Sequence, residues 1–144
     1  MKVSQFQGQW RFLSNFWFAE VRLGNMVFPT VEHAYQAAKT LDMKQRKEIA
    51  LIPTPAKAKR AGRKVDLRPD WDTVKIDIMR DLVWQKFRFH PDLQDALLDT
   101  GNLVLEDGNH WNDGFWGICP PNSGNGENHL GQILMEVRSN LRKE

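Results

Sequence analysis

The chain has 144 residues, 41% of them hydrophobic, which is enough for one domain spanning residues 1–144 with a core of its own. A formal net charge of +2 argues against a strongly basic nucleic-acid coat protein, and a single cysteine, Cys119, excludes an intramolecular disulfide. The N-terminus has no apolar run typical of a signal peptide, and no segment is long enough to cross a bilayer. We therefore expect a cytoplasmic protein without membrane contacts.

A β-hairpin is the first predicted element. Residues 17–23 and 26–28 are rich in β-branched and aromatic side chains and flank Gly24-Asn25, a dipeptide that favours a two-residue hairpin turn. Pro29 has no backbone N–H and is expected to end the second strand.

A short helix is predicted directly after the hairpin. Thr30 is a favourable N-cap for it. A buried helical stripe follows at Val31, Ala34, Tyr35 and Ala38. Glu32, Gln36 and Lys39 share a second, polar stripe. Two interpretations of this stripe stay open: an exposed face with a surface network, or one wall of a ligand site under the later aromatic loop.

Capping residues and apolar spacing predict five further helices. Asp42, Thr54 and Asp70 each stand before a helical segment. The expected elements are helices over 43–51, 55–63 and 71–89, a short helix ending at Asp99, a brief strand at 103–105, and a final helix that buries Leu130, Ile133, Leu134, Val137 and Leu141. The predicted fold is therefore α+β and predominantly helical, with a short N-terminal hairpin.

The segment 107–129, just before the final helix, is long and rich in glycine, asparagine and proline. A loop of this length in so small a domain is usually functional. Within it Asp113 is followed by Gly114, and glycine lets a backbone turn sharply and approach a ligand closely. Asp113 can instead simply cap a turn. If it is functional, Asp113 and Glu32 are carboxylates set among aromatic residues, as in a pocket that performs acid–base chemistry on a flat ring.

Basic residues are concentrated between positions 44 and 64. They are Lys44, Arg46, Lys47, Lys57, Lys59, Arg60, Arg63 and Lys64, against Glu48 as the one acidic residue. Most of them can belong to a solvated helix face, and such a patch can also hold phosphate. Arg63 and Arg68 are the best phosphate-binding candidates because they flank a turn rich in charge.

Two other functional classes fit parts of the sequence. A nucleic-acid-binding module would use the basic segment together with tryptophans as stacking platforms, and its affinity would fall steeply with salt. A metal-dependent hydrolase would place His110, Asp113 and His129 on one ion, but no spacing matches a zinc or iron signature. We therefore expect neither a metal nor another cofactor.

Several motifs in the chain recur together, in this order, in one family. They are Phe12-Leu13-Ser14-Asn15-Phe16, the stretch Val31–Lys39, Gly62-Arg63, Leu67–Trp71, Thr100-Gly101, Asp113–Gly117 and Gly126–Gly131. Over Phe6–Arg138 the chain closely resembles the YbiA-like family, also called the NADAR domain family. The resemblance implies a compact, mostly helical α+β fold and N-glycosidase activity. Members cleave the bond between a base and ribose, in early riboflavin-pathway intermediates or in ADP-ribosylated guanine.

The resemblance also assigns residues. It implies that Glu32 and Asp113 are the catalytic carboxylates and that Lys39, at the end of the first helix motif, belongs to the catalytic set. The substrate-binding residues that it implies are Asn15, Arg63, Arg68 and Trp71. Trp116, which could also stack on the base, and Phe115 beside it are further substrate-binding candidates. Residues 118–125 lie in a variable loop, so specificity carried by that loop does not transfer.

The chemistry of N-glycoside cleavage is compatible with these residues. Positive charge develops at the anomeric carbon, so a nearby carboxylate stabilises the transition state, and a second can activate water or protonate the departing base. A neutral lysine could instead attack the anomeric carbon and form an imine. The two routes are close competitors. The expected partner is a small nucleotide-like substrate carrying phosphate, with ADP-ribosylated guanine in nucleic acid as the alternative.

Overall fold

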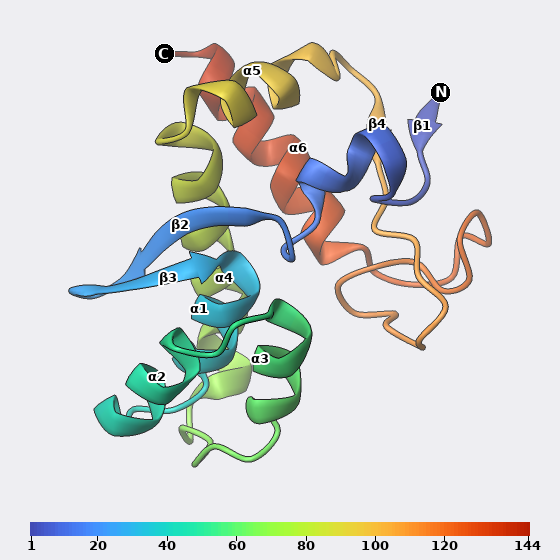
Figure 1. Ribbon diagram of the computed structural model, residues 1–144. Helices are drawn as coiled ribbons and strands as arrows, with labels where there is room; N and C mark the ends of the chain where they lie inside the picture. Colours follow the sequence, from blue (N-terminus) through green and yellow to red (C-terminus); the bar gives the residue numbers. More distant parts are fainter. The chain divides into compact units, whose positions relative to one another are not determined.

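The computed structural model describes residues 1–144. The chain forms two compact units. The hairpin unit is Asn15–Lys86, and the terminal unit combines Met1–Ser14 with Phe87–Glu144. Helices dominate both units, and the four short strands form two separate two-stranded sheets (Figure 1). This confirms the predicted α+β class, while a single domain over residues 1–144 stays a prediction. No helix is both long enough and apolar enough to cross a membrane.

The predicted hairpin is present at the start of the hairpin unit. Strands β2 (Phe18–Leu23) and β3 (Met26–Thr30) pair antiparallel, with Leu23 opposite Met26 across the Gly24-Asn25 turn. The prediction for Pro29 was wrong, because β3 continues through it to Thr30. In a two-stranded sheet both strands are edge strands, where a missing backbone N–H is tolerated.

Four helices complete the hairpin unit. They are α1 (Val31–Ala38), α2 (Met43–Ala50), α3 (Pro55–Ala61) and α4 (Trp71–Arg88), whose last two residues belong to the terminal unit. Thr30, Asp42 and Thr54 accept backbone N–H bonds as side-chain N-caps, as the sequence predicts. Helix α1 packs against both strands of the hairpin and against α2 and α3 (Figure 1). It is therefore the central element of this unit.

The terminal unit contains helices α5 (Pro91–Asp99) and α6 (His129–Arg142), a 3₁₀ helix η1 (Gly8–Leu13), and the parallel strands β1 (Lys2–Val3) and β4 (Val104–Leu105). Helix α6 packs against α5 and β4 and buries the predicted apolar stripe. The sequence analysis did not predict β1 or η1. Strands of two residues are too short to show alternation, so the pairing of β1 with β4 depends on contacts about a hundred residues apart.

Candidate functional site

The predicted polar stripe of α1 is buried, which rules out the exposed-face interpretation for its first two members. Glu32 is 8% exposed and Gln36 is 4% exposed. The Gln36 Nε2 donates a hydrogen bond of 2.8 Å to Glu32 Oε2. A carboxylate removed from water in this way must be held by specific donors.

A buried hydrogen-bond network fixes the beginning of α1. Thr30 Oγ1 accepts the backbone N–H of His33 at 3.0 Å and lies 2.7 Å from His33 Nδ1, while His33 Nε2 lies 2.9 Å from the Ile52 carbonyl oxygen. A carbonyl can only accept, so Nε2 carries the proton and Nδ1 accepts from the Thr30 hydroxyl. Burial lowers the pKa of His33 and outweighs the hydrogen bond to the Ile52 carbonyl, which raises it. The net lowering of the pKa favours the neutral ring.

Asn15 contributes to this region through its backbone. Its carbonyl oxygen accepts the Glu32 N–H at 3.1 Å, and its side-chain Nδ2 lies 3.5 Å from Met79 Sδ. The structure thus places Asn15 against the first turn of α1. Its predicted contact with ribose or phosphate stays a prediction.

Lys39 follows the last residue of α1, and its pKa is lowered by its surroundings. Burial is the largest influence and lowers the pKa of Lys39; Glu32 raises that pKa, and the cations Arg63, Lys59 and Lys75 lower it. The neutral amine, which is the nucleophilic form of lysine, is therefore more accessible than in an ordinary surface lysine. Lys39, Glu32 and Arg63, all predicted from sequence, are electrostatically coupled in the hairpin unit.

The ring of Tyr35 lies near this lysine and packs against the ring of Trp71. The ring centroids of Tyr35 and Trp71 are 5.1 Å apart at an interplanar angle of 54°, and the Lys39 Nζ lies 5.8 Å from the centre of the Tyr35 ring. Trp71, a predicted substrate contact, is thus packed against Tyr35 and is 7% exposed. Lys75 was missed by the sequence analysis. Its position four residues after Trp71, on the same side of α4, was the signal that could have revealed it.

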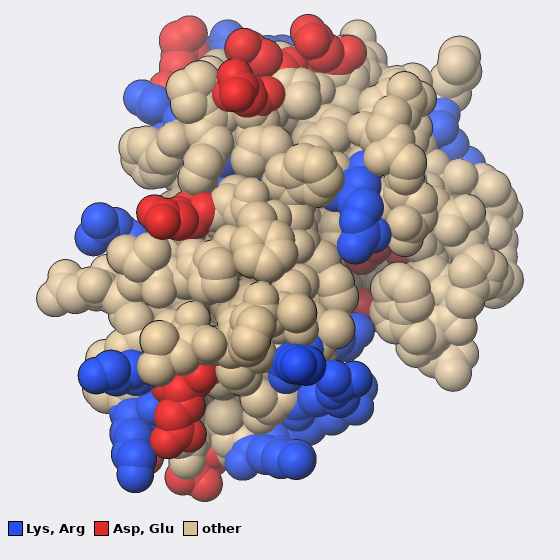
Figure 2. All heavy atoms as spheres, in the orientation of Figure 1, with Lys and Arg blue, Asp and Glu red and all other residues tan.

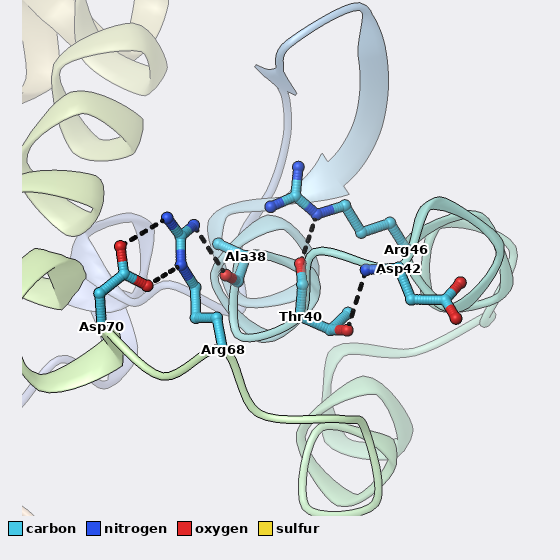
Figure 3. Close-up of polar contacts among 6 residues, drawn as sticks. All are labelled: Ala38, Thr40, Asp42, Arg46, Arg68 and Asp70. Carbon is cyan, nitrogen blue, oxygen red and sulfur yellow. Dashed lines mark hydrogen bonds and ion pairs between the residues drawn. The ribbon is translucent and has the colours of Figure 1, made fainter.

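Arg68 contacts the end of α1 and forms an ion pair with Asp70 (Figure 3). Its Nε and Nη2 donate to the two carboxylate oxygens of Asp70 at 2.6 and 3.0 Å, and its Nη1 lies 3.5 Å from the Ala38 carbonyl oxygen. Its backbone N–H donates to the Lys39 carbonyl at 2.7 Å. The hydrogen bond to Asp70 raises the pKa of Arg68. Arg68 thus holds the end of α1 in two ways, through its guanidinium at Ala38 and through its backbone N–H at Lys39. Its predicted contact with phosphate stays a prediction.

A second arginine holds the chain just beyond α1 (Figure 3). Arg46 Nε donates to the Thr40 carbonyl oxygen at 2.7 Å, and the Thr40 hydroxyl accepts the Asp42 N–H at 3.1 Å. Burial, followed by the charge of Arg68, lowers the pKa of Arg46. The two arginines anchor successive carbonyls at the helix end, where partial negative charge favours cations.

The remaining basic residues of the segment 44–64 lie mainly on α2 and α3. Figure 2 shows lysine and arginine side chains gathered over these two helices. Most of them are exposed, as for a solvated helix face, whereas Lys59 is half-buried and acts electrostatically on Lys39. The structure therefore separates Lys59 and Arg63 from the rest of the basic segment.

Asp113, in the terminal unit, caps a turn. Its Oδ1 accepts the backbone N–H groups of Phe115 at 3.2 Å and Trp116 at 2.9 Å. Asn109, which is 1% exposed, holds the same turn by donating to the Asp113 carbonyl oxygen at 2.9 Å and accepting the Asp113 N–H at 3.0 Å. The sequence analysis missed Asn109, although a side chain that bonds nearby backbone groups is common for asparagine in turns.

The aromatic residues after Asp113 cluster with the first residue of α6. The Phe115 ring lies 4.4 Å from the His129 ring and 4.8 Å from the Trp116 ring, and Trp116 lies 6.2 Å from His129. All three are partly exposed. His129 Nε2 also lies 3.6 Å from Glu127 Oε1. No group of three or more His, Cys, Asp or Glu side chains in the structure could hold a metal ion.

Glycines in the loop permit close contact between its own two branches. Gly126 has φ +141°, and a Cβ there would collide with the Gly117 carbonyl oxygen. The Glu127 N–H donates to the Gly114 carbonyl at 2.8 Å, directly beside this contact. These glycines therefore close the loop on itself, a structural role that their spacing in the sequence did not reveal.

The chain resembles known proteins over nearly its whole length. The NADAR domain model matches residues 3–142. The chain is 42% identical to an N-glycosidase of Nostoc punctiforme, over 90% of this chain and 84% of that protein. It is 34% identical to a riboflavin biosynthesis protein of Vibrio vulnificus, over 92% of this chain and 36% of the longer relative. The NMR structure of Escherichia coli YbiA matches with a TM-score of 0.85 and 34% identity, over 99% of this chain and 84% of that one. The chain therefore belongs to the NADAR domain family.

Proposed function

We propose that this chain is an N-glycosidase that hydrolyses the base–ribose bond of a nucleotide-like substrate, with Glu32 and Lys39 as its catalytic residues. The observation that carries the proposal is a buried carboxylate and a lysine of lowered pKa on one short helix. The name of the Nostoc punctiforme relative supports the same class of reaction. Each residue has a defined chemical task.

Glu32 supplies negative charge for the transition state. Cleavage of an N-glycosidic bond develops positive charge at the anomeric carbon of ribose, so a fixed carboxylate stabilises the transition state more than the substrate. Gln36 holds Glu32 Oε2 in a defined direction, and burial strengthens the interaction with the developing charge.

Lys39 supplies the nucleophile in one of two competing routes. Its neutral amine attacks the anomeric carbon, the C–N bond to the base breaks, and the base leaves with a proton. Opening of the ribose ring then gives an imine, and addition of water releases the ribose with its phosphate and restores the amine. In the other route water attacks directly. The lowered pKa of Lys39 favours the lysine route.

Asp113 is the second catalytic carboxylate in this proposal, on the strength of its motif. Its Oδ1 makes both turn hydrogen bonds, so Oδ2 keeps acceptor capacity that the turn does not use. Asp113 belongs to the terminal unit, and its role is tested by its own variant below.

The proposed substrate is a ribosylamino-pyrimidine phosphate of early riboflavin synthesis. Trp71 offers a ring for stacking on the pyrimidine, and base–aromatic stacking contributes about 1–3 kcal/mol in nucleic-acid systems. Arg63 and Lys59 offer cationic partners for one phosphate. The riboflavin biosynthesis relative of Vibrio vulnificus supports this class of substrate. ADP-ribosylated guanine is the alternative, and the basic side chains over α2 and α3 favour it.

The test is release of free base from both substrates at equal concentration, compared as kcat/KM. We expect cleavage of the pyrimidine phosphate, unaffected by EDTA. Absence of base release from either substrate would reject the N-glycosidase proposal. A preference above about tenfold for ADP-ribosyl-guanine, equal to about 1.4 kcal/mol of transition-state binding, would reverse the order of substrates but keep the reaction class.

A further inference from the structure

Only one of the two polar atoms of the Gln36 side-chain amide forms a hydrogen bond. Its Nε2 donates to Glu32 Oε2 at 2.8 Å, whereas its Oε1 is buried and has no hydrogen-bond partner. A buried polar atom left without a partner lowers the stability of the fold. Its retention in this position calls for a compensating role.

Gly62 explains where the unsatisfied oxygen lies. Gly62 has φ −61° and ψ −20°, an ordinary helical conformation that any residue adopts, so its backbone does not require glycine. A Cβ at this position would lie 2.7 Å from Gln36 Cδ and 2.9 Å from Gln36 Cβ, and would collide with Oε1. Glycine is therefore needed here because the Gln36 side chain occupies the volume that a Cβ would take.

The direction of the amide, with Nε2 toward Glu32, is the one that an ionised carboxylate requires. An ionised carboxylate only accepts hydrogen bonds, so the amide must present Nε2 to Glu32 and leave Oε1 against Gly62. The reversed amide would place its oxygen against the carboxylate and its nitrogen in a position without an acceptor. A donor to the charged form of a carboxyl group favours that form.

We propose that Gln36 is a positioning residue that keeps Glu32 ionised and oriented, and that Gly62 provides the space in which the Gln36 amide takes this direction. The inference rests on the catalytic role proposed above for Glu32. The carboxylate belongs to the reacting centre, whereas Gln36 acts only through it.

The first test is the pH profile of kcat/KM for Gln36→Met, which keeps the length of the side chain but removes the donor. We expect the acidic limb to move to higher pH by about one unit, as for loss of a hydrogen bond to a charged group. Gln85→Met is the control, because Gln85 Nε2 donates to Asp81 Oδ2 at 2.9 Å with the same spacing of four residues, but on the surface. It also removes two hydrogen bonds to the Arg22 backbone, so it controls for a general loss of side-chain hydrogen bonds away from Glu32. Its limb should not move. If kcat/KM of Gln36→Met were lower at every pH but its acidic limb stayed at the same pH, the proposal would be contradicted.

The second test is a double-mutant cycle. Gly62→Ala should lower kcat/KM by about tenfold or more in the wild-type chain, but by less than about twofold when Gln36→Gly has removed the whole side chain, including the Cβ that would lie 2.9 Å from the new methyl group. Equal effects in both backgrounds would mean that Gly62 acts independently of Gln36, which would overturn the second half of the proposal.

Titration of the Glu32 carboxyl by ¹³C NMR, without substrate, separates this inference from the proposed function. A midpoint that rises in Gln36→Met, together with full activity of Glu32→Gln, would reject the catalytic role of Glu32 and keep the positioning role of Gln36. An unchanged midpoint, together with an inactive Glu32→Gln, would do the reverse. If Gln36→Met does not fold, Gln36→Glu keeps the shape, and its second carboxyl should raise the midpoint further.

Discussion

Lys39 illustrates how neighbouring charges decide the chemistry of one residue. Burial lowers the pKa of its amine most, three cations lower it further, and the anion Glu32 raises it. The two carboxylates are held by different donors. A side-chain amide holds Glu32, and backbone N–H groups hold Asp113. Each of the three can therefore be tested by a substitution that keeps its structural contacts.

Glu32→Gln is expected to reduce release of free base by at least about a hundredfold, the common scale for loss of a positioned acid or base. The fold should persist, because the amide oxygen of the new side chain can still accept from Gln36. Chromatography of the released base and circular dichroism measure the two effects. Glu20→Gln, on the exposed side of β2, is the control and should keep full turnover. Near wild-type turnover of Glu32→Gln would remove Glu32 from the catalytic set.

Asp113→Asn is expected to cause a loss of similar size, at least about a hundredfold, with the turn intact. Asparagine keeps an oxygen that accepts from Phe115 and Trp116, so only the charge is removed. Asp113→Ala would remove the turn hydrogen bonds as well and should also lower the melting temperature. Activity in Asp113→Asn close to that of the wild type would leave Asp113 with the turn as its sole role.

Borohydride added during turnover is expected to trap Lys39. Reduction of the imine between the Lys39 amine and the opened ribose would give a stable secondary amine on the peptide that contains Lys39. Mass spectrometry of a digest detects the mass increase, and Lys39→Met provides the matched negative control. No adduct in the wild type, together with an active Lys39→Met, would instead establish direct attack by water.

At the scale of elements, α1 depends on how its two ends are held. Thr30 and His33 fix its beginning, and Arg68 fixes its end through the Ala38 and Lys39 carbonyls. An isolated helix of eight residues is not stable in water, so these contacts and the packing of both faces maintain it. The catalytic candidates thus occupy a helix whose geometry is imposed by its surroundings.

Thr30→Val is expected to destabilise the protein by about 1–2 kcal/mol. Valine keeps the branched shape at this fully buried position but removes the oxygen that accepts from the His33 backbone and pairs with its ring. Urea unfolding measures the loss. Thr54→Val is the matched control, because the Thr54 cap is exposed and its hydrogen bond to the Lys57 N–H is longer, at 3.3 Å. A loss in Thr54→Val equal to that in Thr30→Val would show that the buried network adds nothing to an ordinary cap.

At the scale of the whole molecule, stability depends on pH through a buried lysine. Lys86 is 1% exposed, and burial lowers its pKa to about 7 from a model-peptide value of 10.5. Between these two values the unfolded chain binds a proton that the folded chain does not. The free energy of unfolding must therefore rise with pH across this window.

We expect the wild-type protein to gain up to about 1.4 kcal/mol of stability per pH unit from Lys86 between about pH 7 and pH 10. Lys86→Met removes the titrating group while keeping an apolar chain of similar length, so its stability should depend less on pH in this range. Urea unfolding of both proteins at several pH values measures the difference. Parallel curves would show that Lys86 keeps its ordinary pKa in the folded protein.

The sequence by itself determined the local structure and the family. Caps at Thr30, Asp42 and Thr54 and the Gly24-Asn25 turn act within a few residues, so the helices that they begin and the hairpin could be predicted. The ordered motifs, which extend over most of the chain, identified the family. The one clear local error, at Pro29, arose because the tolerance of proline depends on whether a strand lies at an edge.

Only the tertiary structure decided which of the singled-out side chains are chemically unusual. Spacing alone allowed an exposed stripe on α1, and it took the packing of α1 in the fold to show that Glu32 and Gln36 are buried. The pKa of Lys39 is lowered mainly by burial, and then by the cations Arg63, Lys59 and Lys75, which folding brings near it. Gly62 could be recognised as the space for Gln36 only from their contact. Burial and electrostatic fields arise from residues that folding brings together, so a linear pattern cannot specify them.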